Sequence, residues 1–174
     1  KLEEAQKKFK KTLLLEPNHI SAHNNLGFVL ANQGMLDEAI KFFKKAISLN
    51  TDYVDAYNNL GKALRDLGKH HEAIDAFKKA ILLKPNYAHA YNNLGTIFKD
   101  QGNFVEAVNS FEKAILINPN FALAFNNMGV ALKDLGKMNE AIDAFKKALS
   151  LEFEDSTTHK NLSYALLNSG ELQE

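Results

Sequence analysis

Tyr57-Asn58-Asn59-Leu60-Gly61 is a short stretch that returns 34 residues later as Tyr91-Asn92-Asn93-Leu94-Gly95. Related copies run from His23 to Gly27 and from Phe125 to Gly129, and a more divergent copy runs from His159 to Ser163, always at the same step. A fixed period of this size is typical of stacked supersecondary units. The chain is therefore interpreted as a repeat protein.

Each repeat carries a second glycine, such as Gly68, with helix-like spacing of apolar residues on both sides of it. From Tyr57 to Leu64 before this glycine, and from Ala73 to Phe77 after it, apolar residues recur at the spacing of one helix face. Neither segment shows the strict alternation of a strand. Each repeat is predicted to be two α-helices joined by a short turn, which gives an all-α fold.

The small residues of the repeat predict close packing and sharp helix ends. A glycine inside a helix costs about 1 kcal/mol relative to alanine, so Gly61 is expected to face a close neighbour, for which Ala73 is the candidate. Gly68 suits the left-handed residue that ends a helix. Pro85 is placed to stop the second helix, and Asn86 to cap the next one. The first glycine recurs as Gly27, Gly95 and Gly129, and the second as Gly34, Gly102, Gly136 and Gly170. The proline recurs as Pro17 and Pro119, and the asparagine after it as Asn120.

These columns together resemble the tetratricopeptide repeat family, whose 34-residue units place an aromatic, Leu-Gly, Ala, an aromatic, Ala and Pro at set positions. The resemblance covers the whole chain. It implies a right-handed α-solenoid in which the first helix of each repeat lines the concave side. We divide the single array 1–174 into a truncated second helix at 1–19, full repeats at 20–53, 54–87, 88–121 and 122–155, and a first helix at 156–174.

Composition and motifs argue against several other classes of function. The formal net charge is zero, so no general attraction to nucleic acid is expected. No apolar run reaches the roughly 20 residues of a membrane helix, so no membrane insertion is expected. Cysteine is absent, which leaves the redox compartment open, and the cytoplasm is the working expectation. No phosphate loop, nucleophile elbow or zinc-protease motif occurs, so we expect neither enzymatic activity nor a cofactor.

The histidines were weighed as metal ligands. His19 and His23 are four residues apart, a spacing that can hold zinc on one helix face. However, His23 and His159 occupy the aromatic column of the repeat, so rings packed between helices are the preferred interpretation and no metal site is expected. His70 and His71 are expected to lie solvated in the turn between two helices.

Polar residues between the apolar columns of the first helices predict a binding groove. An asparagine recurs at Asn25, Asn59, Asn93, Asn127 and Asn161. Its amide could bond the neighbouring repeat, or it could clasp the backbone of an extended peptide, and both explanations stay open. Helices packed roughly 8–10 Å apart would offer one amide for about every third residue of such a peptide. The predicted groove residues are Asn24, Asn25, Phe28, Asp55, Asn58, Asn59, Lys62, Arg65, His89, Asn92, Asn93, Thr96, Lys99, Asn126, Asn127, Val130, Lys133 and Asn161.

The asparagine ladder also resembles that of the repeat domain of the O-linked N-acetylglucosamine transferases, which holds extended protein substrates by their backbone. We therefore expect a non-enzymatic scaffold that binds a protein or an extended peptide segment. One alternative is the substrate-recruiting arm of a larger enzyme such as a glycosyltransferase. Another is a structural protein that assembles head to tail through its truncated end repeats, unless longer flanks supply the missing helices.

Overall fold

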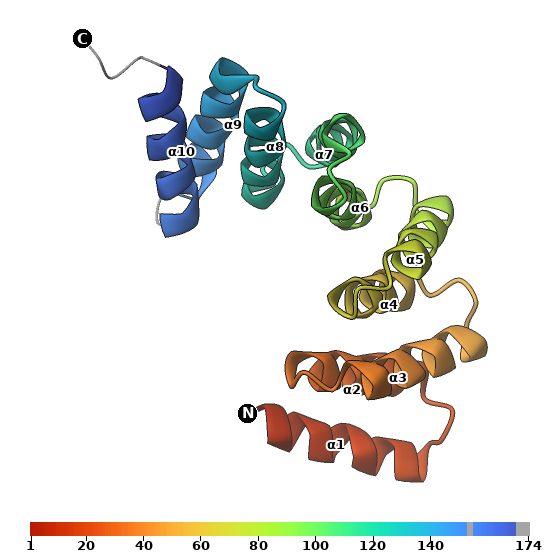
Figure 1. The fold of residues 1–174 in the computed structure, drawn as a ribbon. Helices are drawn as coiled ribbons and strands as arrows, with labels where there is room; N and C mark the ends of the chain where they lie inside the picture. The colour runs from red at the N-terminus through yellow and green to blue at the C-terminus, as the bar shows by residue number, and fades with distance from the viewer. Residues whose placement is uncertain (153–154, 170–174) are drawn as a thin grey trace. The chain divides into compact units, whose positions relative to one another are not determined.

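The computed structural model describes residues 1–152 and 155–169, and within them all ten regular elements are α-helices (Figure 1). The last five residues of the segment predicted as a first helix at 156–174, among them the helix-ending glycine predicted at Gly170, lie outside the described residues. The helices are α1 (Leu2–Leu15), α2 (Ile20–Asn32), α3 (Leu36–Leu49), α4 (Val54–Asp66), α5 (His70–Leu83), α6 (Ala88–Asp100), α7 (Phe104–Ile117), α8 (Ala122–Asp134), α9 (Met138–Leu151) and α10 (Ser156–Ser169).

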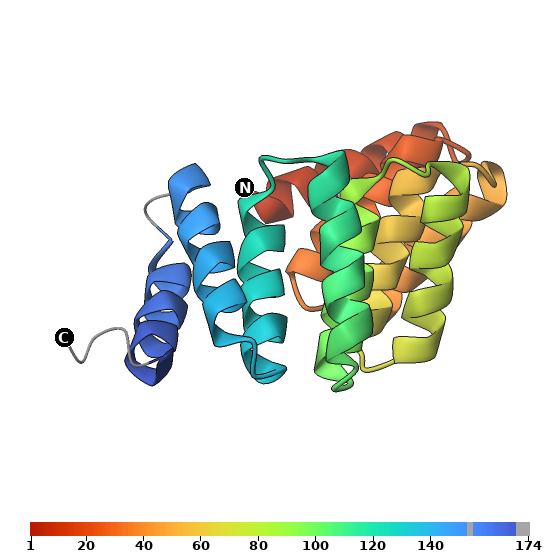
Figure 2. The same ribbon diagram turned by 90° about the horizontal axis from the view of Figure 1, so that it is seen from above.

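The helices form two compact units, Lys1–Pro85 and Asn86–Glu174. In the first unit α2 packs on α3 and α4 packs on α5, while α1 adds to α2 and α3 contacts α4. In the second unit α6 packs on α7, α8 packs on α9, α7 contacts α8, and α10 adds to α9. Successive helices within each unit run antiparallel (Figure 2). The predicted helical hairpins and the all-α repeat fold are confirmed.

The turn inside each helix pair is made by the second glycine. Gly68 has a φ of 75°, and its N–H donates to the carbonyl of Arg65 at 2.8 Å. The N–H of Lys69 donates to the carbonyl of Leu64 at 2.9 Å. These two bonds satisfy carbonyls that the end of a helix leaves without partners, and the conformation favours glycine. The prediction of a left-handed helix end is confirmed.

The turn between helix pairs differs in part from the prediction. The prolines stand two residues beyond the last residue of a helix, at Pro17, Pro85 and Pro119. The caps expected from Asn86 and Asn120 are not formed, because the tight turn makes Tyr87 and Phe121 the residues that precede α6 and α8. The side chain of Asn118 instead accepts a hydrogen bond from the N–H of Asn120 at 3.2 Å, which stabilises the turn itself.

The first glycine of each repeat lies against a phenylalanine ring of its partner helix. A Cβ added to Gly61 would lie 2.6 Å from Cε1 of Phe77, which is fully buried. The nearest atoms to this added Cβ belong to Phe77 and not to the predicted Ala73, because Phe77 lies one turn further along α5 and its side chain extends back toward the start of that helix. At the equivalent Gly27 the carbonyl of Ala39, the counterpart of Ala73, lies 3.1 Å from the added Cβ. The same contact joins Gly27 to Phe43, Gly95 to Phe111 and Gly129 to Phe145.

Gly61→Ala is expected to lower the free energy of unfolding by about 1–3 kcal/mol, because the added methyl overlaps a ring with little room to move. Chemical denaturation of the purified chain measures this. A double-mutant cycle with Phe77→Leu tests the cause, since the smaller side chain should make the alanine less costly. Simple additivity of the two changes would contradict the proposed contact.

Candidate functional site

The two consecutive asparagines of each first helix have different environments. The first one was predicted to line the groove, yet it is buried in every full repeat. Its exposed fraction is 5% at Asn24, 7% at Asn58, 4% at Asn92 and 7% at Asn126. The second asparagine is exposed at Asn25 and half-buried in the other copies. The sequence does not distinguish the first asparagine from the second, because the first is buried by contact with the neighbouring repeat.

Asparagines of adjacent repeats form a ladder of hydrogen bonds. In the first unit, Nδ2 of Asn59 on α4 donates to Oδ1 of Asn24 on α2 at 3.0 Å. In the second unit the same bond joins Asn127 to Asn92 at 3.1 Å and Asn161 to Asn126 at 3.0 Å. A buried amide oxygen without a partner is costly, so each such bond is worth about 1 kcal/mol. The structural explanation of the asparagine column therefore holds for these three pairs.

A small pocket opens between α2 and α4 on the side that carries the exposed first-helix residues. It has a volume of about 90 Å³, and Asn32, Asn59, Lys62 and Asp66 supply its polar groups. Phe28 supplies an aromatic surface that is 47% exposed. The pocket thus brings together amide donors and acceptors, a cation, an anion and an aromatic ring. These groups make it suitable for one side chain of a partner protein.

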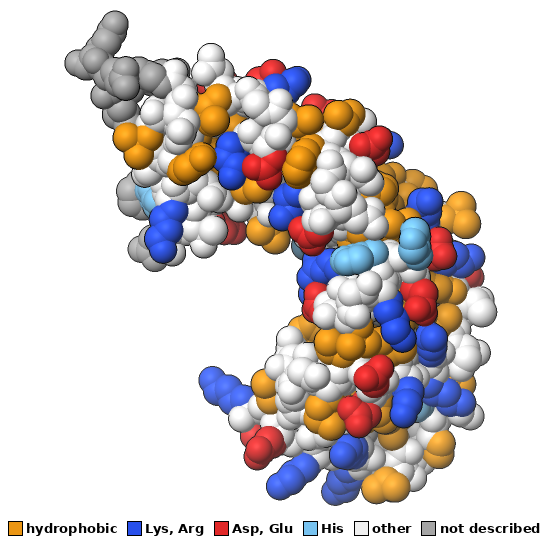
Figure 3. All heavy atoms as spheres, in the orientation of Figure 1, with side chains coloured by type: hydrophobic (Ala, Val, Ile, Leu, Met, Phe, Trp, Pro, Cys, Tyr) orange, Lys and Arg blue, Asp and Glu red, His pale blue; other side chains and the backbone are white. Residues whose placement is uncertain are grey.

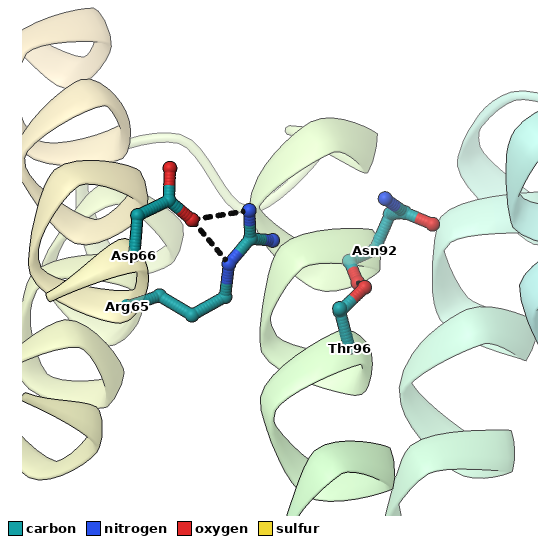
Figure 4. A network of polar contacts seen from close by, with 4 residues as sticks. All are labelled: Arg65, Asp66, Asn92 and Thr96. Carbon is teal, nitrogen blue, oxygen red and sulfur yellow. Dashed lines mark hydrogen bonds and ion pairs between the residues drawn. The ribbon is translucent and has the colours of Figure 1, made fainter. Parts of the chain in front are cut away.

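In the second unit the position of Phe28 and Lys62 is taken by Thr96, Val130 and Tyr164 at successive 34-residue steps. The Oγ1 of Thr96 donates to the backbone carbonyl of Asn92 on its own helix at 3.0 Å (Figure 4). Tyr164 is 55% exposed, and Nζ of Lys133 lies 5.3 Å from its ring centroid. Tyr164 was missing from the predicted groove, although its step from Val130 could have identified it.

The charged residues at the ends of the first helices pair with their own neighbours. Arg65 contacts Asp66 at 2.8 Å, with two nitrogens of the guanidinium donating to the same carboxylate oxygen (Figure 4). The equivalent pairs are Lys99 with Asp100 at 3.1 Å and Lys133 with Asp134 at 3.3 Å. Figure 3 shows cations and anions interspersed over the visible face. The charge of these helix ends is therefore mixed, and each partly exposed pair contributes at most about 1 kcal/mol.

The remaining predicted residues lie at the starts and middles of the first helices. Asp55 on α4 and His89 on α6 are both exposed, and Asn93 is half-buried. The ring of His89 stands edge-on to that of Phe121, with centroids 4.9 Å apart. His89 therefore belongs to an aromatic contact within the second unit as well as to the surface.

The histidines at the start of α2 are used in packing and capping. Nδ1 of His19 accepts the backbone N–H of Ala22 at 3.2 Å, so His19 caps the helix. Nε2 of His23 donates to the carbonyl of Pro17 at 2.8 Å, and its ring centroid lies 5.9 Å from that of Phe42. The expectation of a packed ring is confirmed for His23. Within residues 1–152 and 155–169, no group of three side chains is arranged to hold a metal ion.

His71 is exposed, as predicted, whereas His70 and His159 differ from their predicted environments. His70 and His71 form the first turn of α5 instead of a loop, and Nδ1 of His70 is buried. His159, at the aromatic position of α10, is exposed instead of packed between helices. Sequence periodicity identifies the position of a ring but not whether another helix covers it.

The length and composition of the described helices decide whether any of them can span a membrane. None of them combines the length and the apolar character needed to cross a bilayer.

Comparison with known families identifies the class to which this helical repeat belongs. Models described as "Tetratricopeptide repeat" match residues 18–82, 56–117 and 122–155. The chain therefore belongs to the tetratricopeptide repeat family, as the resemblance in its sequence indicated. Proteins of this family are generally non-enzymatic interaction scaffolds that bind protein or peptide partners.

Solved structures give the same assignment. The crystal structure of MamA is 34% identical with a TM-score of 0.76, and the match covers 90% of this chain and 91% of MamA. The Cut9 complex with Hcn1 matches at 24% identity and a TM-score of 0.88, covering 97% of this chain and 34% of the other. YrrB, described as a tetratricopeptide repeat protein with an unusual peptide-binding site, matches at 21% identity and a TM-score of 0.71, covering 94% and 84%. No curated protein sequence gives a significant match.

Removing one member of the asparagine ladder is expected to destabilise the first unit. Asn59→Ala and Asn24→Ala should each lower the free energy of unfolding by about 1 kcal/mol, and together by less than the sum, because they break one bond. Thermal and chemical denaturation measure both. Asn25→Ala is the matched control, since Asn25 occupies the same column but is exposed and bonds Asn24 of its own helix. An equal loss in the control would show that the inter-helix bond contributes no more than the bond from Asn24 to Asn25 within α2.

Proposed function

We propose that this chain is a non-enzymatic scaffold that binds an extended segment of a partner protein along its first helices. The observation that carries the proposal is the contrast between two sets of positions. The hydrogen-bonded asparagines are constant from repeat to repeat, whereas the exposed or half-buried position beside them changes, as from Phe28 to Lys62 and from Val130 to Tyr164. The constant asparagines suit binding of the partner's backbone, which is the same in every peptide. The variable positions beside them suit selection among the partner's side chains.

The ladder and a peptide clasp are chemically compatible. A side-chain amide has two N–H donors and an oxygen with two acceptor sites. The bond from Asn59 to Asn24 uses one donor, and it orients the rest of the Asn59 amide beside the pocket between α2 and α4. An amide fixed in this way loses little side-chain entropy when a partner binds.

The pocket of the first unit supports recognition of a side chain rather than of a small molecule. Its volume of about 90 Å³ is well below the roughly 300–1,000 Å³ of typical small-molecule sites. Phe28 offers apolar contact, while Lys62 and Asp66 can select the charge of the neighbouring partner residue. The peptide-binding site named for YrrB, a structure of similar fold, is consistent with this proposal.

Two further proposals from the sequence remain open to test. The chain could recruit substrates for a larger enzyme such as a glycosyltransferase. It could also associate with a second copy, and Leu14 and Leu15 on α1, with Leu167 on α10, would supply exposed apolar surface for that contact. Light scattering over a wide concentration range tests association, and a constant monomer mass would contradict it.

The binding proposal is tested with peptides selected from a random library displayed on phage. Phe28→Ser combined with Lys62→Ala should weaken a peptide selected on the unaltered chain by about tenfold, because truncating an apolar anchor typically costs more than 1 kcal/mol. Calorimetry measures the affinity and a thermal melt checks folding. Leu82→Ser with Lys78→Ala on α5 is the matched control, since both residues are exposed away from the first helices. Equal affinity of the two double variants would contradict the assignment of this face.

A further inference from the structure

Another pocket lies within the unit Asn86–Glu174. It is lined by residues of α7 and α9, which are the second helices of their repeats, and by residues of α8. Its volume is about 330 Å³. The floor is apolar and comes from Val108, Phe125, Met128 and Leu132. Of these, Leu132 belongs to the packed core of this unit, and Val108 and Met128 pack against that core. The pocket between α2 and α4 belongs to the other unit and shares no residue with it.

The rim of this α7–α9 pocket is predominantly acidic. Glu112, Glu140 and Asp143 line it, with Lys147 as the one cation among the lining residues. Glu140 contacts Lys137 at 3.2 Å. Glu112 and Asp143 form no ion pair with any residue that the structure describes. The rim therefore has two carboxylates available to a cation from outside.

The acidic rim departs from the pattern of the repeat. The position of Glu112 holds a lysine in every other second helix, at Lys10, Lys44, Lys78 and Lys146. Helix packing does not require a carboxylate there, because lysine occupies the same position in the other copies of the fold. At the equivalent positions of the first unit, on α3 and α5, the charges balance as Lys44 and Lys79 against Glu72 and Asp75. The change to Glu112 thus creates a net negative rim only in the second unit.

We propose that the α7–α9 pocket binds a basic segment of a partner protein through an arginine side chain. The aliphatic part of arginine would lie on the apolar floor, as long cationic side chains cover apolar surface elsewhere. Its guanidinium would reach Glu112 and Asp143 at the rim, where a planar fork of donors suits carboxylates better than an ammonium does. This contact uses second helices, so it is separate from the proposed peptide-binding face of the first helices.

The test titrates the ¹⁵N-labelled chain with the blocked pentapeptide Gly-Arg-Leu-Arg-Gly and with its Glu-containing counterpart. We expect the arginine peptide alone to shift backbone signals of α7 and α9. Glu112→Lys should weaken its affinity about threefold to fivefold, the size expected for a partly exposed charge pair. Lysine at this position is already present in four other second helices, so the variant should fold, and a thermal melt checks this.

Glu106→Lys is the matched control, because it makes the same charge change at an exposed position of α7 that does not line the pocket. Unchanged affinity in this control, with loss in Glu112→Lys, supports the site. Equal loss in both variants would show nonspecific attraction to charge and overturn the proposal. Shifts confined to the first helices, or no shifts at millimolar peptide, would overturn it as well.

Discussion

The contact between a helix-interior glycine and a phenylalanine ring sets the spacing of each helix pair. At Gly61 the missing side chain makes room for the ring of Phe77, which is thereby buried without a cavity. Because the same contact recurs in each full repeat, the first helix of every full repeat has one face that packs on its own partner helix. Its remaining faces are left for the neighbouring repeat and for the surface, and the position of each asparagine follows from this.

The sequence predicts well those features that depend on a residue's own backbone. Gly68 ends its helix in the left-handed conformation, and Pro85 stands beyond the next helix end, as expected from local chemistry. Contacts that depend on a side chain from another helix were less predictable. The glycine was assigned to Ala73 rather than Phe77, and Asn58 was placed on the surface although it is buried. In these cases periodicity identified the position, but side-chain direction and the adjacent repeat decided the contact.

The asparagine ladder explains how one residue type can appear both structural and functional in a single sequence. The buried partner, such as Asn24, requires a donor, and the half-buried partner, such as Asn59, supplies it while remaining at the edge of the pocket. Selection for stability alone would keep both asparagines in every repeat. Their repetition therefore does not by itself indicate a ligand, and the argument for binding depends on the varying residues beside them, such as Phe28 and Lys62.

The same reasoning applies to the second helices, where the common residue at the position of Glu112 is lysine. A repeat fold provides its own internal comparison, because equivalent positions have the same backbone environment and differ mainly in what they present outward. A charge reversal at one exposed copy leaves the helix pairing intact, as the Gly95–Phe111 contact of that pair shows. It does change the electrostatic environment of the α7–α9 pocket, whose apolar floor can bury the stem of a long side chain. Departures from the repeat at exposed positions are therefore more informative about partners than the repeated residues themselves.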